Sequence, residues 1–580
     1  MKKYLKVFIF ILVFFIINTS IAQIIKDVKG KKLIIFNDMS QCEPKSAISD
    51  KQNLYNWRAV DFETIDSLAQ YNIKGKMLMA DPENNAPDIT LKLNQKGWYS
   101  IFVGLFRIYP DDGIRLKLTN DKATVFVKAD NAYEYIDEVF WKNAELTGQN
   151  LIIKKPFNNQ GTAYIAYVKL VPLDNKEIEQ IKKDAENNSN KRLIALNDGH
   201  GIFYSKKPES EEAILEDVEP YKNTDFDKLY WCVGAGGDVF TYPTSLGKVY
   251  GDNMESYPRD GDRTIAESMK ILNSKGINSV KEVVGYAKEN GLKIYLSLRM
   301  EAFMCHQPWD GIFNGYFYDN NPQLRCKDID GSEIARMSFA YDAVQNFIIN
   351  IFKEFASYNI HGISMLYTRG APYLLYEEPI IKGFIAKYNI NPRTLKEDDE
   401  RLLNYRSEFM DNFMRKVNLT LDSISKNTGK ERIKISVHGL NDYKNNHFFG
   451  LNIEKWAKEK MINEVVAYPW NGGVIDVDYY VNITKNTNCS LYVEMMPRSM
   501  PPAKYKEKAE ELYKKGVYGL SFWDTNSRHP KLTQWSMIRR LGHKDELEKW
   551  DDGNGTYFKK IRLKYIGQYR VDKYPPGDCY

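Results

Sequence analysis

The alternation of short apolar runs with amphipathic helical patterns from residue 192 onward constrains the fold more than any other feature of the sequence. Such alternation is typical of parallel α/β architecture, in which each strand is followed by a covering helix. Eight runs have the character of buried strands, and they begin at Leu193, Leu229, Leu292, Ile360, Ile433, Ile462, Ser490 and Val517. Eight strands followed by helices fit a closed (β/α)8 barrel better than an open doubly wound sheet, so we predict a TIM barrel over residues 192–548.

The part of the chain before the barrel follows a different period. Residues 23–173 contain short strands in which apolar and polar side chains alternate, as at Ile114, Leu116 and Leu118. A period of two is typical of strands with one buried face, and many short strands between turn residues favour a sandwich. We therefore predict an antiparallel β-sandwich over residues 23–173.

Two shorter segments flank the predicted barrel. Residues 174–191 are almost wholly polar and are predicted to form a linker that is helical in part. Residues 549–580 hold short strand-like pieces without a helical pattern. We expect this C-terminal extension to pack on the barrel, with a small accessory sheet as the alternative.

The first 22 residues have the pattern of a secretory signal peptide. Lysines precede an apolar run from Val7 to Ile17, and the small-residue stretch Ser20–Ala22 precedes Gln23. The run is shorter than the roughly 20 apolar residues that span a bilayer, so cleavage is favoured over retention as an anchor. The sequence thus predicts an exported protein, periplasmic, cell-surface or secreted, without membrane insertion after cleavage.

Charge and cysteine content exclude several classes of partner. Lys and Arg number 81 and Asp and Glu 76, a net charge of +5 that gives no electrostatic case for nucleic acid. The six cysteines are scattered without a CxxC pair, so isolated buried thiols are favoured over a zinc cluster or a disulfide scaffold. The stretch at Gly234 has Val239 where a dinucleotide fingerprint needs a third glycine, and P-loop, HExxH and GxSxG motifs do not occur. The sequence predicts neither a cofactor nor a metal.

Polar and aromatic residues gather where the predicted barrel strands end. In TIM barrels the reacting groups lie at the C-terminal ends of the strands and in the loops that follow, so these residues are expected to converge on one mouth. Carboxylates and arginines bind sugar hydroxyls, and indole rings stack on the apolar face of a pyranose, so a poly- or oligosaccharide is the predicted partner. The candidate substrate-binding residues are Asp198, His200, Asp238, Arg299, Glu301, Arg369, His438, Trp470, Trp523 and Asp524.

Glycosidic cleavage requires two carboxyl groups that flank one bond, one protonated and one ionised. Glu494 is the candidate for the ionised group, because it lies in an otherwise apolar strand where a charge is expected only beside a polar centre. A buried ion pair with Arg498 or Arg369 is the alternative for Glu494. Glu377 and Glu378, in a loop beside an aromatic residue, are the candidates for the acid. Their alternative role is as charges at a helix N-terminus.

Three further residues have open roles. Asp524 is a third candidate for proton transfer, although binding of a substrate hydroxyl is favoured for it. Asp198 and His200 either bind sugar or brace the barrel mouth.

Three phrases resemble the glycosyl hydrolase-like family 10 barrels and related secreted glycoside hydrolases. They are GGDVFTYPT at 236–244, HGISMLYTRGAPY at 361–373 and YGLSFWDTN at 518–526. Arg369 matches the strand-four pattern DGIHLDYxR of that family, whereas His361 and Leu366 stand where the pattern has acidic residues. The resemblance implies a secreted glycoside hydrolase with a carboxylate pair at the barrel mouth. The missing acids keep open the alternative of a non-catalytic glycan-binding protein with a degenerate barrel.

The N-terminal region carries a resemblance of its own. The phrases GWYSIFVGLF at 97–106 and YIAYVKLVPL at 164–173 look like strands of a galactose-binding-like jelly roll. This resemblance implies either attachment to carbohydrate or packing against the barrel.

Overall fold

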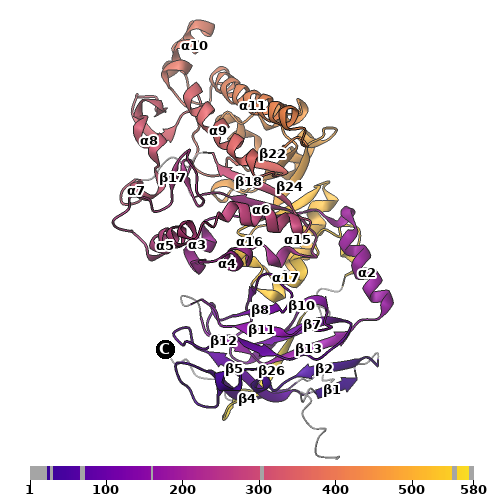
Figure 1. Ribbon diagram of the computed structural model, residues 1–580. Coiled ribbons are helices and arrows are strands. Elements are labelled where there is room, and N and C mark those ends of the chain that lie inside the picture. Colours follow the sequence, from indigo (N-terminus) through magenta and orange to yellow (C-terminus); the bar gives the residue numbers. More distant parts are fainter. Residues whose placement is uncertain are drawn as a thin grey trace, which may run out of the picture. The chain divides into compact units, whose positions relative to one another are not determined.

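The fold is described from a computed structural model (Figure 1). Two compact units are present, one of residues up to 184 with 530–536 and 553–580, and one of residues 185–529 with 537–552. The predicted signal peptide lies outside the described residues. The structure describes residues 23–26, 30–65, 72–157, 161–234, 236–300, 306–550 and 558–573.

The first unit is built of two sheets that are almost entirely antiparallel, as the period of two predicts. The larger sheet has the order β1-β2-β13-β7-β10-β26-β4-β5-β12, and the smaller has the order β6-β11-β8-β9. Side chains of β8 alternate between buried and half-buried, with Ile114, Leu116 and Leu118 buried. The strands are β1 (Gln23–Lys26), β2 (Lys32–Phe36), β3 (Ile48–Ser49), β4 (Trp57–Ile65), β5 (Lys74–Ala80), β6 (Ile89–Leu91), β7 (Trp98–Leu105), β8 (Ile114–Leu118), β9 (Val125–Val127), β10 (Tyr135–Glu145), β11 (Leu151–Lys154), β12 (Ala163–Ile165), β13 (Tyr167–Pro172), β26 (Phe558–Ile566) and β27 (Tyr569–Arg570).

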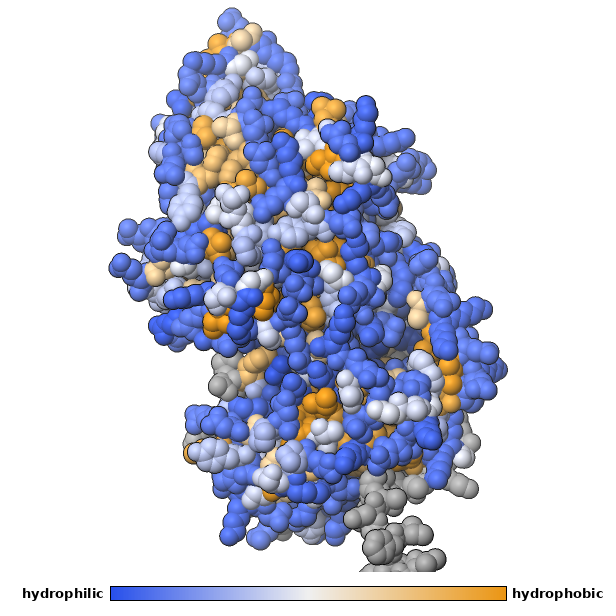
Figure 2. All heavy atoms as spheres, viewed as in Figure 1, coloured by the Kyte–Doolittle hydropathy of each residue, from blue (hydrophilic) through white to orange (hydrophobic). Residues whose placement is uncertain are grey.

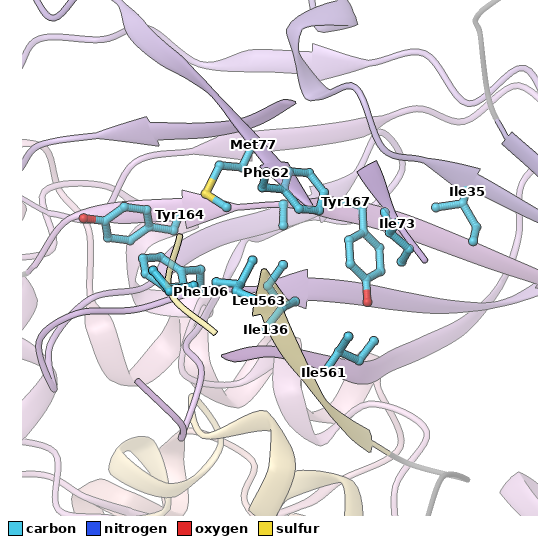
Figure 3. Packing of buried hydrophobic residues seen from close by; sticks show 12 residues of the cluster. Ile35, Phe62, Ile73, Met77, Phe106, Ile136, Tyr164, Tyr167, Ile561 and Leu563 are labelled. Carbon is cyan, nitrogen blue, oxygen red and sulfur yellow. The ribbon is translucent and has the colours of Figure 1, made fainter. Parts of the chain in front are cut away.

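Strand β26 belongs to the first unit although it follows the barrel in sequence. It pairs with β10 on one side and β4 on the other. Ile561 and Leu563 are buried in a cluster with Phe62, Ile136 and Tyr167 from the N-terminal strands (Figure 3). The expectation that residues 549–580 pack on the barrel is therefore wrong. The physical reason is that β4 and β10 both present open hydrogen-bonding edges that β26 fills, and its alternate apolar side chains complete their core.

The polar segment after the first unit is helical in part, as expected. Helix α2 (Asn175–Glu186) contains no buried residue, and a short turn of 3-10 helix covers Asn188–Asn190.

The second unit contains the closed parallel barrel that the sequence predicts, with the strand order β14-β15-β18-β21-β22-β23-β24-β25. Closure comes from parallel pairing of β14 with β25, in which Leu196 lies opposite Trp523. The strands are β14 (Leu193–Asn197), β15 (Phe226–Cys232), β18 (Lys293–Arg299), β21 (Gly362–Leu366), β22 (Lys434–Gly439), β23 (Glu464–Ala467), β24 (Ser490–Glu494) and β25 (Gly519–Trp523).

Helices and two small strand pairs fill the connections between barrel strands (Figure 1). In α9 (Asp342–Ser357), Val344, Ile348, Ile351 and Phe355 are buried at helical spacing. The strand pairs are β16 (Val239–Phe240) with β17 (Lys248–Val249) and β19 (Arg325–Lys327) with β20 (Glu333–Met337). The helices are α3 (Gly201–Lys206), α4 (Glu211–Leu215), α5 (Asp260–Ser274), α6 (Ser279–Glu289), α7 (Asp310–Phe313), α8 (Tyr316–Asn320), α9 (Asp342–Ser357), α10 (Glu378–Tyr388), α11 (Glu400–Thr428), α12 (Tyr443–Phe448), α13 (Ile453–Lys458), α14 (Val477–Thr484), α15 (Pro502–Lys514), α16 (Thr525–Arg528) and α17 (Leu532–Ile538).

A buried polar network fills the barrel interior near the N-terminal ends of the strands. Glu464 accepts hydrogen bonds from the hydroxyls of Tyr230 and Tyr295, and its Oε1 lies 3.1 Å from Lys228 Nζ. Lys228 also donates to the Tyr492 hydroxyl at 2.5 Å. Because every member is buried and bonded, this end of the barrel is a packed core. This leaves the C-terminal ends of the strands as the end of the barrel where a ligand can bind.

The surface of the molecule is mainly polar where it is visible. Hydrophobic side chains form small separate patches on the face shown in Figure 2. Over the part of the chain that the structure describes, no helix has both the length and the apolar character needed to cross a membrane.

Removing β26 tests its place in the first unit. Deletion of residues 553–580 leaves β4 and β10 each with one unpaired edge and opens the core, so we expect the first unit to lose its resistance to proteases. Limited proteolysis with mass spectrometry should then find cleavage within residues 30–173. Deletion of residues 574–580 alone is the matched control and should leave resistance unchanged. Equal resistance of both truncated chains would contradict the assignment.

Candidate active site

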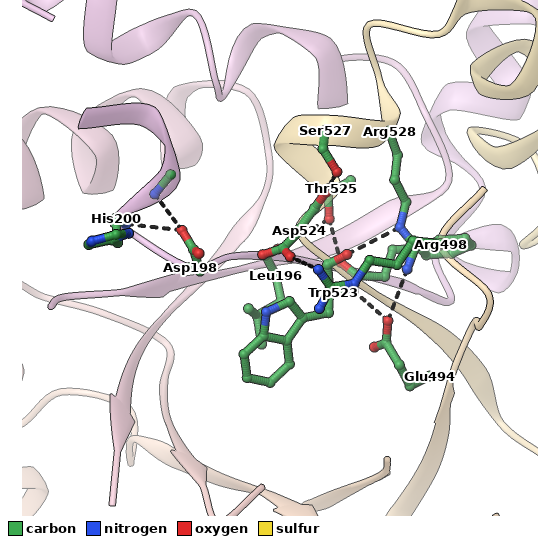
Figure 4. A network of polar contacts seen from close by, with 12 residues as sticks. Leu196, Asp198, His200, Glu494, Arg498, Trp523, Asp524, Thr525, Ser527 and Arg528 are labelled. Carbon is green, nitrogen blue, oxygen red and sulfur yellow. Dashed lines mark hydrogen bonds and ion pairs between the residues drawn. The ribbon is translucent and has the colours of Figure 1, made fainter. Parts of the chain in front are cut away.

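Two aspartates follow the neighbouring strands that close the barrel. Asp198 comes directly after β14, and Asp524 comes directly after β25. Because Leu196 and Trp523 are opposite each other in the register, the two carboxyl groups lie at the same rim (Figure 4). Barrel closure thus joins side chains that are far apart in the sequence, at the end where TIM barrels hold their reacting groups.

Asp198 is held by a tight turn. Its Oδ1 accepts hydrogen bonds from the backbone N–H groups of His200 at 3.0 Å and Gly201 at 2.6 Å. Gly199 has a φ of +64°, and a Cβ at this position would lie 1.4 Å from the carbonyl oxygen of Cys232, so only glycine fits. Asp198 Oδ2 lies 3.8 Å from Arg299 Nη2. Burial raises the pKa of Asp198, but attraction to Arg299 and His200 and the two N–H bonds outweigh burial and hold this pKa below its ordinary value.

The surroundings of Asp524 shift its pKa in the opposite direction from that of Asp198. Its backbone is left-handed, with a φ of 50°, and the residue begins the short helix α16. Its Oδ2 is paired with Arg498, while its Oδ1 is buried without a hydrogen-bond partner. Burial raises the pKa of Asp524, and repulsion from Asp198 adds to this effect despite Arg498, Arg369 and Arg299 nearby. Two neighbouring carboxyl groups whose pKa values are pushed apart are suited to act as an acid and a base.

Glu494 lies behind this pair, and its side chain is fully buried. Its Oε1 accepts a hydrogen bond from Trp523 N–H at 2.6 Å and is 3.2 Å from Arg528 Nη2, whereas Oε2 has no partner. Burial raises the pKa of Glu494 to about 7, against the attraction of Arg528. The alternative of a buried ion pair therefore describes Glu494, with Arg528 as partner in place of Arg498 or Arg369. The structure thus places Glu494 below the rim with a raised pKa, whereas the ionised catalytic role expected of it needs a carboxylate that is open to a ligand.

The candidate acids Glu377 and Glu378 are not brought to the Asp198–Asp524 pair. Glu377 is fully buried, and its carboxylate accepts hydrogen bonds from the N–H groups of Lys327 in β19 and Leu375. Glu378, the first residue of α10, is exposed and paired with Lys382 one turn later. Glu378 thus has the alternative position of a charge in the first turn of a helix, whereas the Glu377 carboxylate anchors the preceding loop and makes no cap hydrogen bond to the helix.

An aromatic layer lies below the rim. Trp523 is fully buried, with His438 and Tyr468 against its ring at centroid distances of 5.8 and 5.2 Å. Burial lowers the pKa of His438 to about 3, so this side chain is neutral. The guanidinium carbon of Arg369 lies 5.2 Å over the Trp523 ring. Trp523 thus supports Arg369, in place of the expected stacking of its indole on a sugar.

The other predicted binding residues have different surroundings. His200 is stacked on Tyr204 at 5.6 Å, and burial lowers its pKa to about 4. Asp238 is fully buried and accepts hydrogen bonds from Gly315 and Tyr318 N–H, so it anchors the loop at α8 and is not brought to the rim. Trp470 is half-buried against Phe449. Glu301 lies outside the described residues.

Three residues belong to the site although nothing in the sequence pattern sets them apart from other strand-end side chains. Arg498 is paired with Asp524, and Arg528 is paired with Glu494. Asn526 has a buried Oδ1 without a hydrogen-bond partner close to the Asp198 turn. A position three to five residues beyond a barrel strand is the only signal they carry, and many residues share it.

No metal site accompanies this arrangement in the described ranges. Within them, no group of three or more His, Cys, Asp or Glu side chains is placed to hold an ion. The thiols of Cys42, Cys232, Cys326 and Cys489 are free and buried.

Comparison with known proteins finds likeness at the level of solved structures. No protein-family model and no curated protein matches the sequence. The glycoside hydrolase domain of PgaB (BpsB) from Bordetella bronchiseptica has a TM-score of 0.41 and 11% identity, covering 60% of this chain and 98% of its own. A ruminal GH26 endo-β-1,4-mannanase has a TM-score of 0.29 and 10% identity. The match covers 90% of this chain and 98% of the mannanase chain.

A third solved structure is the CBM22-1–GH10 xylanase 10B of Clostridium thermocellum, in complex with xylohexaose. Its TM-score is 0.28 and its identity 11%, and the match covers 85% of this chain and 95% of that chain. These three structures are glycoside hydrolases. Scores this low carry no argument about activity, so the proposal that follows rests on the site.

The pH dependence of stability tests the burial of Glu494. Its pKa rises from 4.5 to about 7 on folding, so its contribution to stability is present below pH 4.5 and is lost as the pH rises through 7. Glu494→Gln imitates the neutral carboxyl. It should therefore remove the fall in the free energy of unfolding between pH 4.5 and pH values above 7, which is on the order of 3 kcal/mol in the wild type. Urea denaturation at pH 5 and pH 7.5 measures the difference. Glu459→Gln, an exposed position, is the control, and a wild-type pH slope in Glu494→Gln would refute the burial argument.

Proposed function

We propose that this protein is a glycoside hydrolase that acts on a poly- or oligosaccharide at the barrel mouth. The observation that carries the proposal is the pair Asp198 and Asp524, which share one rim and have pKa values displaced in opposite directions. Hydrolysis of a glycosidic bond needs one carboxyl group of each kind. The surrounding arginines and the unpartnered Asp524 Oδ1 supply further groups for sugar hydroxyls.

Each carboxyl group has a role in this mechanism. Asp524, whose pKa is raised, is the group assigned to donate a proton to the leaving glycosidic oxygen as the sugar–oxygen bond breaks. Asp198, ionised because its pKa is lowered, either attacks the anomeric carbon or takes a proton from the attacking water. Arg498 orients the carboxyl group of Asp524, and Arg299 keeps Asp198 charged. Glu494 and Arg528 fix the ends of β24 and β25 beneath them.

We also propose that the protein is exported and that its first unit attaches to carbohydrate. Support for export is the charge and apolar pattern of residues 1–22. Support for attachment is the resemblance of the phrases at 97–106 and 164–173 to galactose-binding-like strands.

Substitution of either aspartate tests the hydrolase proposal. Asp524→Asn and Asp198→Asn should each lower kcat by about a hundredfold or more, because each removes a proton-transfer or nucleophilic group. Release of reducing ends from a panel of plant and microbial polysaccharides measures the activity. Asp398→Asn, an exposed loop position, is the control. Wild-type turnover in both variants would remove the pair from the mechanism.

The same panel decides the alternative function. A non-catalytic glycan-binding protein is favoured by the ion pairs of Asp198 and Asp524 with Arg299 and Arg498, which could serve recognition alone. Saturable binding without release of reducing ends would establish this alternative.

The pH profile gives a separate test of the roles. Activity should fall as the pH drops through the lowered pKa of Asp198 and as it rises through the raised pKa of Asp524. Arg498→Gln removes a cation that lowers the pKa of Asp524, so its alkaline limb should move to higher pH. The profile of kcat/KM measures both limbs. An unmoved alkaline limb in Arg498→Gln would exclude Asp524 as the acid.

A further inference from the structure

Among the residues that the structure describes, cations outnumber anions at the barrel mouth. Arg299, Arg369 and Arg498 all act on Asp524, and Asp198 is the second carboxylate among them. Glu494 and Arg528 are bonded to each other and buried below the rim, so neither is counted among the groups that face the mouth. Once Asp524 holds the proton that the proposed mechanism requires, three guanidinium groups face the single negative charge of Asp198. The site in its working state therefore has a surplus of positive charge.

Arg369 is the source of the surplus. Arg299 lies beside Asp198 and Arg498 beside Asp524, whereas no carboxylate of the described ranges forms an ion pair with Arg369. Arg369 follows β21, and its side chain is exposed at the mouth. It is nonetheless held in place, because its guanidinium group lies over the buried Trp523 ring.

A second basic cluster lies at the opposite end of the barrel, where Lys288, Lys293, Lys430, Arg432 and Lys434 line a pocket. Three of these five cations have a partner: Lys293 is paired with Asp227, Arg432 is paired with Asp422, and Lys288 lies in the last turn of α6, where a cation offsets the helix dipole. Among the described residues, Arg369 has neither a carboxylate partner nor a helix end, and it is fixed at the mouth by the Trp523 ring.

We propose that the substrate is an acidic glycan and that Arg369 binds the carboxylate of a uronate residue in the barrel mouth. This inference rests on the proposed function. The planar fork of an arginine matches a carboxylate in a bidentate pair, and such pairs are among the strongest hydrogen bonds in proteins. Support from Trp523 reduces the side-chain freedom that binding would otherwise cost. A neutral sugar would leave the charge surplus in place, whereas a uronate reduces it by one.

Matched polymers separate recognition of the carboxylate from hydrolysis. Polygalacturonate, alginate and hyaluronate are each compared with their carboxyl-reduced counterparts, which keep the backbone and lose the charge. Dextran sulfate and dextran form a further pair that reports attraction to any polyanion. Binding and reducing-end release are both measured with the full chain, at low and at moderate salt.

The expected result is a preference of about tenfold or more for at least one polyuronate over its reduced form, the size that one charged hydrogen-bonded pair supplies. Arg369→Gln should abolish this ratio, and Arg369→Lys should keep part of it, because lysine retains the charge without the fork. Arg415→Gln, which removes a charge from the exposed face of α11, should keep the full ratio.

The outcomes distinguish this inference from the proposed function. Hydrolysis of neutral polymers without preference for any polyuronate would overturn the inference and leave the hydrolase proposal standing. Preferential binding of a polyuronate without release of reducing ends would support the inference and refute the hydrolase proposal. Equal preference for dextran sulfate, or loss of the ratio in Arg415→Gln, would also overturn the role of Arg369.

Discussion

Pairing of β14 with β25 is the interaction on which the candidate site depends. It closes the barrel in a register that sets Leu196 against Trp523, and it thereby places Asp198 and Asp524 side by side. Burial and repulsion from Asp198 raise the pKa of Asp524, and Arg299 acts on both carboxyl groups. At the other end of the strands, the buried bonds of Glu464 with Lys228, Tyr230 and Tyr295 fill the interior. The fold thus confines reactive groups to one rim.

Two carboxylates with similar arginine partners differ in how far they are buried, and this difference separates their proposed roles. Glu494 and Asp524 each pair with an arginine, but 0% of the Glu494 side chain and 18% of the Asp524 side chain is exposed. The sealed pair joins strand ends, whereas the open pair remains accessible to a ligand. Arg369 likewise combines support with accessibility. Its guanidinium group lies over an aromatic ring, and its side chain is exposed to solvent. Rigid support beneath open groups is the arrangement that keeps a binding site preorganised.

Local patterns predicted the barrel well because each strand carries its own period and length. All eight predicted runs became barrel strands. Pairing partners have no such local signal, so the place of β26 between β10 and β4 could not be read from residues 549–580. The site was predicted in part. Asp198, Asp524 and Arg369 meet at the mouth, but the sequence could not show whether Glu494 was sealed or open. The adjacent residues Glu377 and Glu378 have the same pattern whether they donate protons or cap a helix.

The position of β26 has a consequence for the order in which the chain acquires its structure. A ribosome produces β4 and β10 long before residues 558–566, so the larger sheet lacks a central strand while the whole barrel is being synthesised. The barrel has all of its strands by Trp523 and is able to fold first. Until the last strand arrives, the nascent sheet exposes two open edges, and this interval is when the chain is most vulnerable to misassembly.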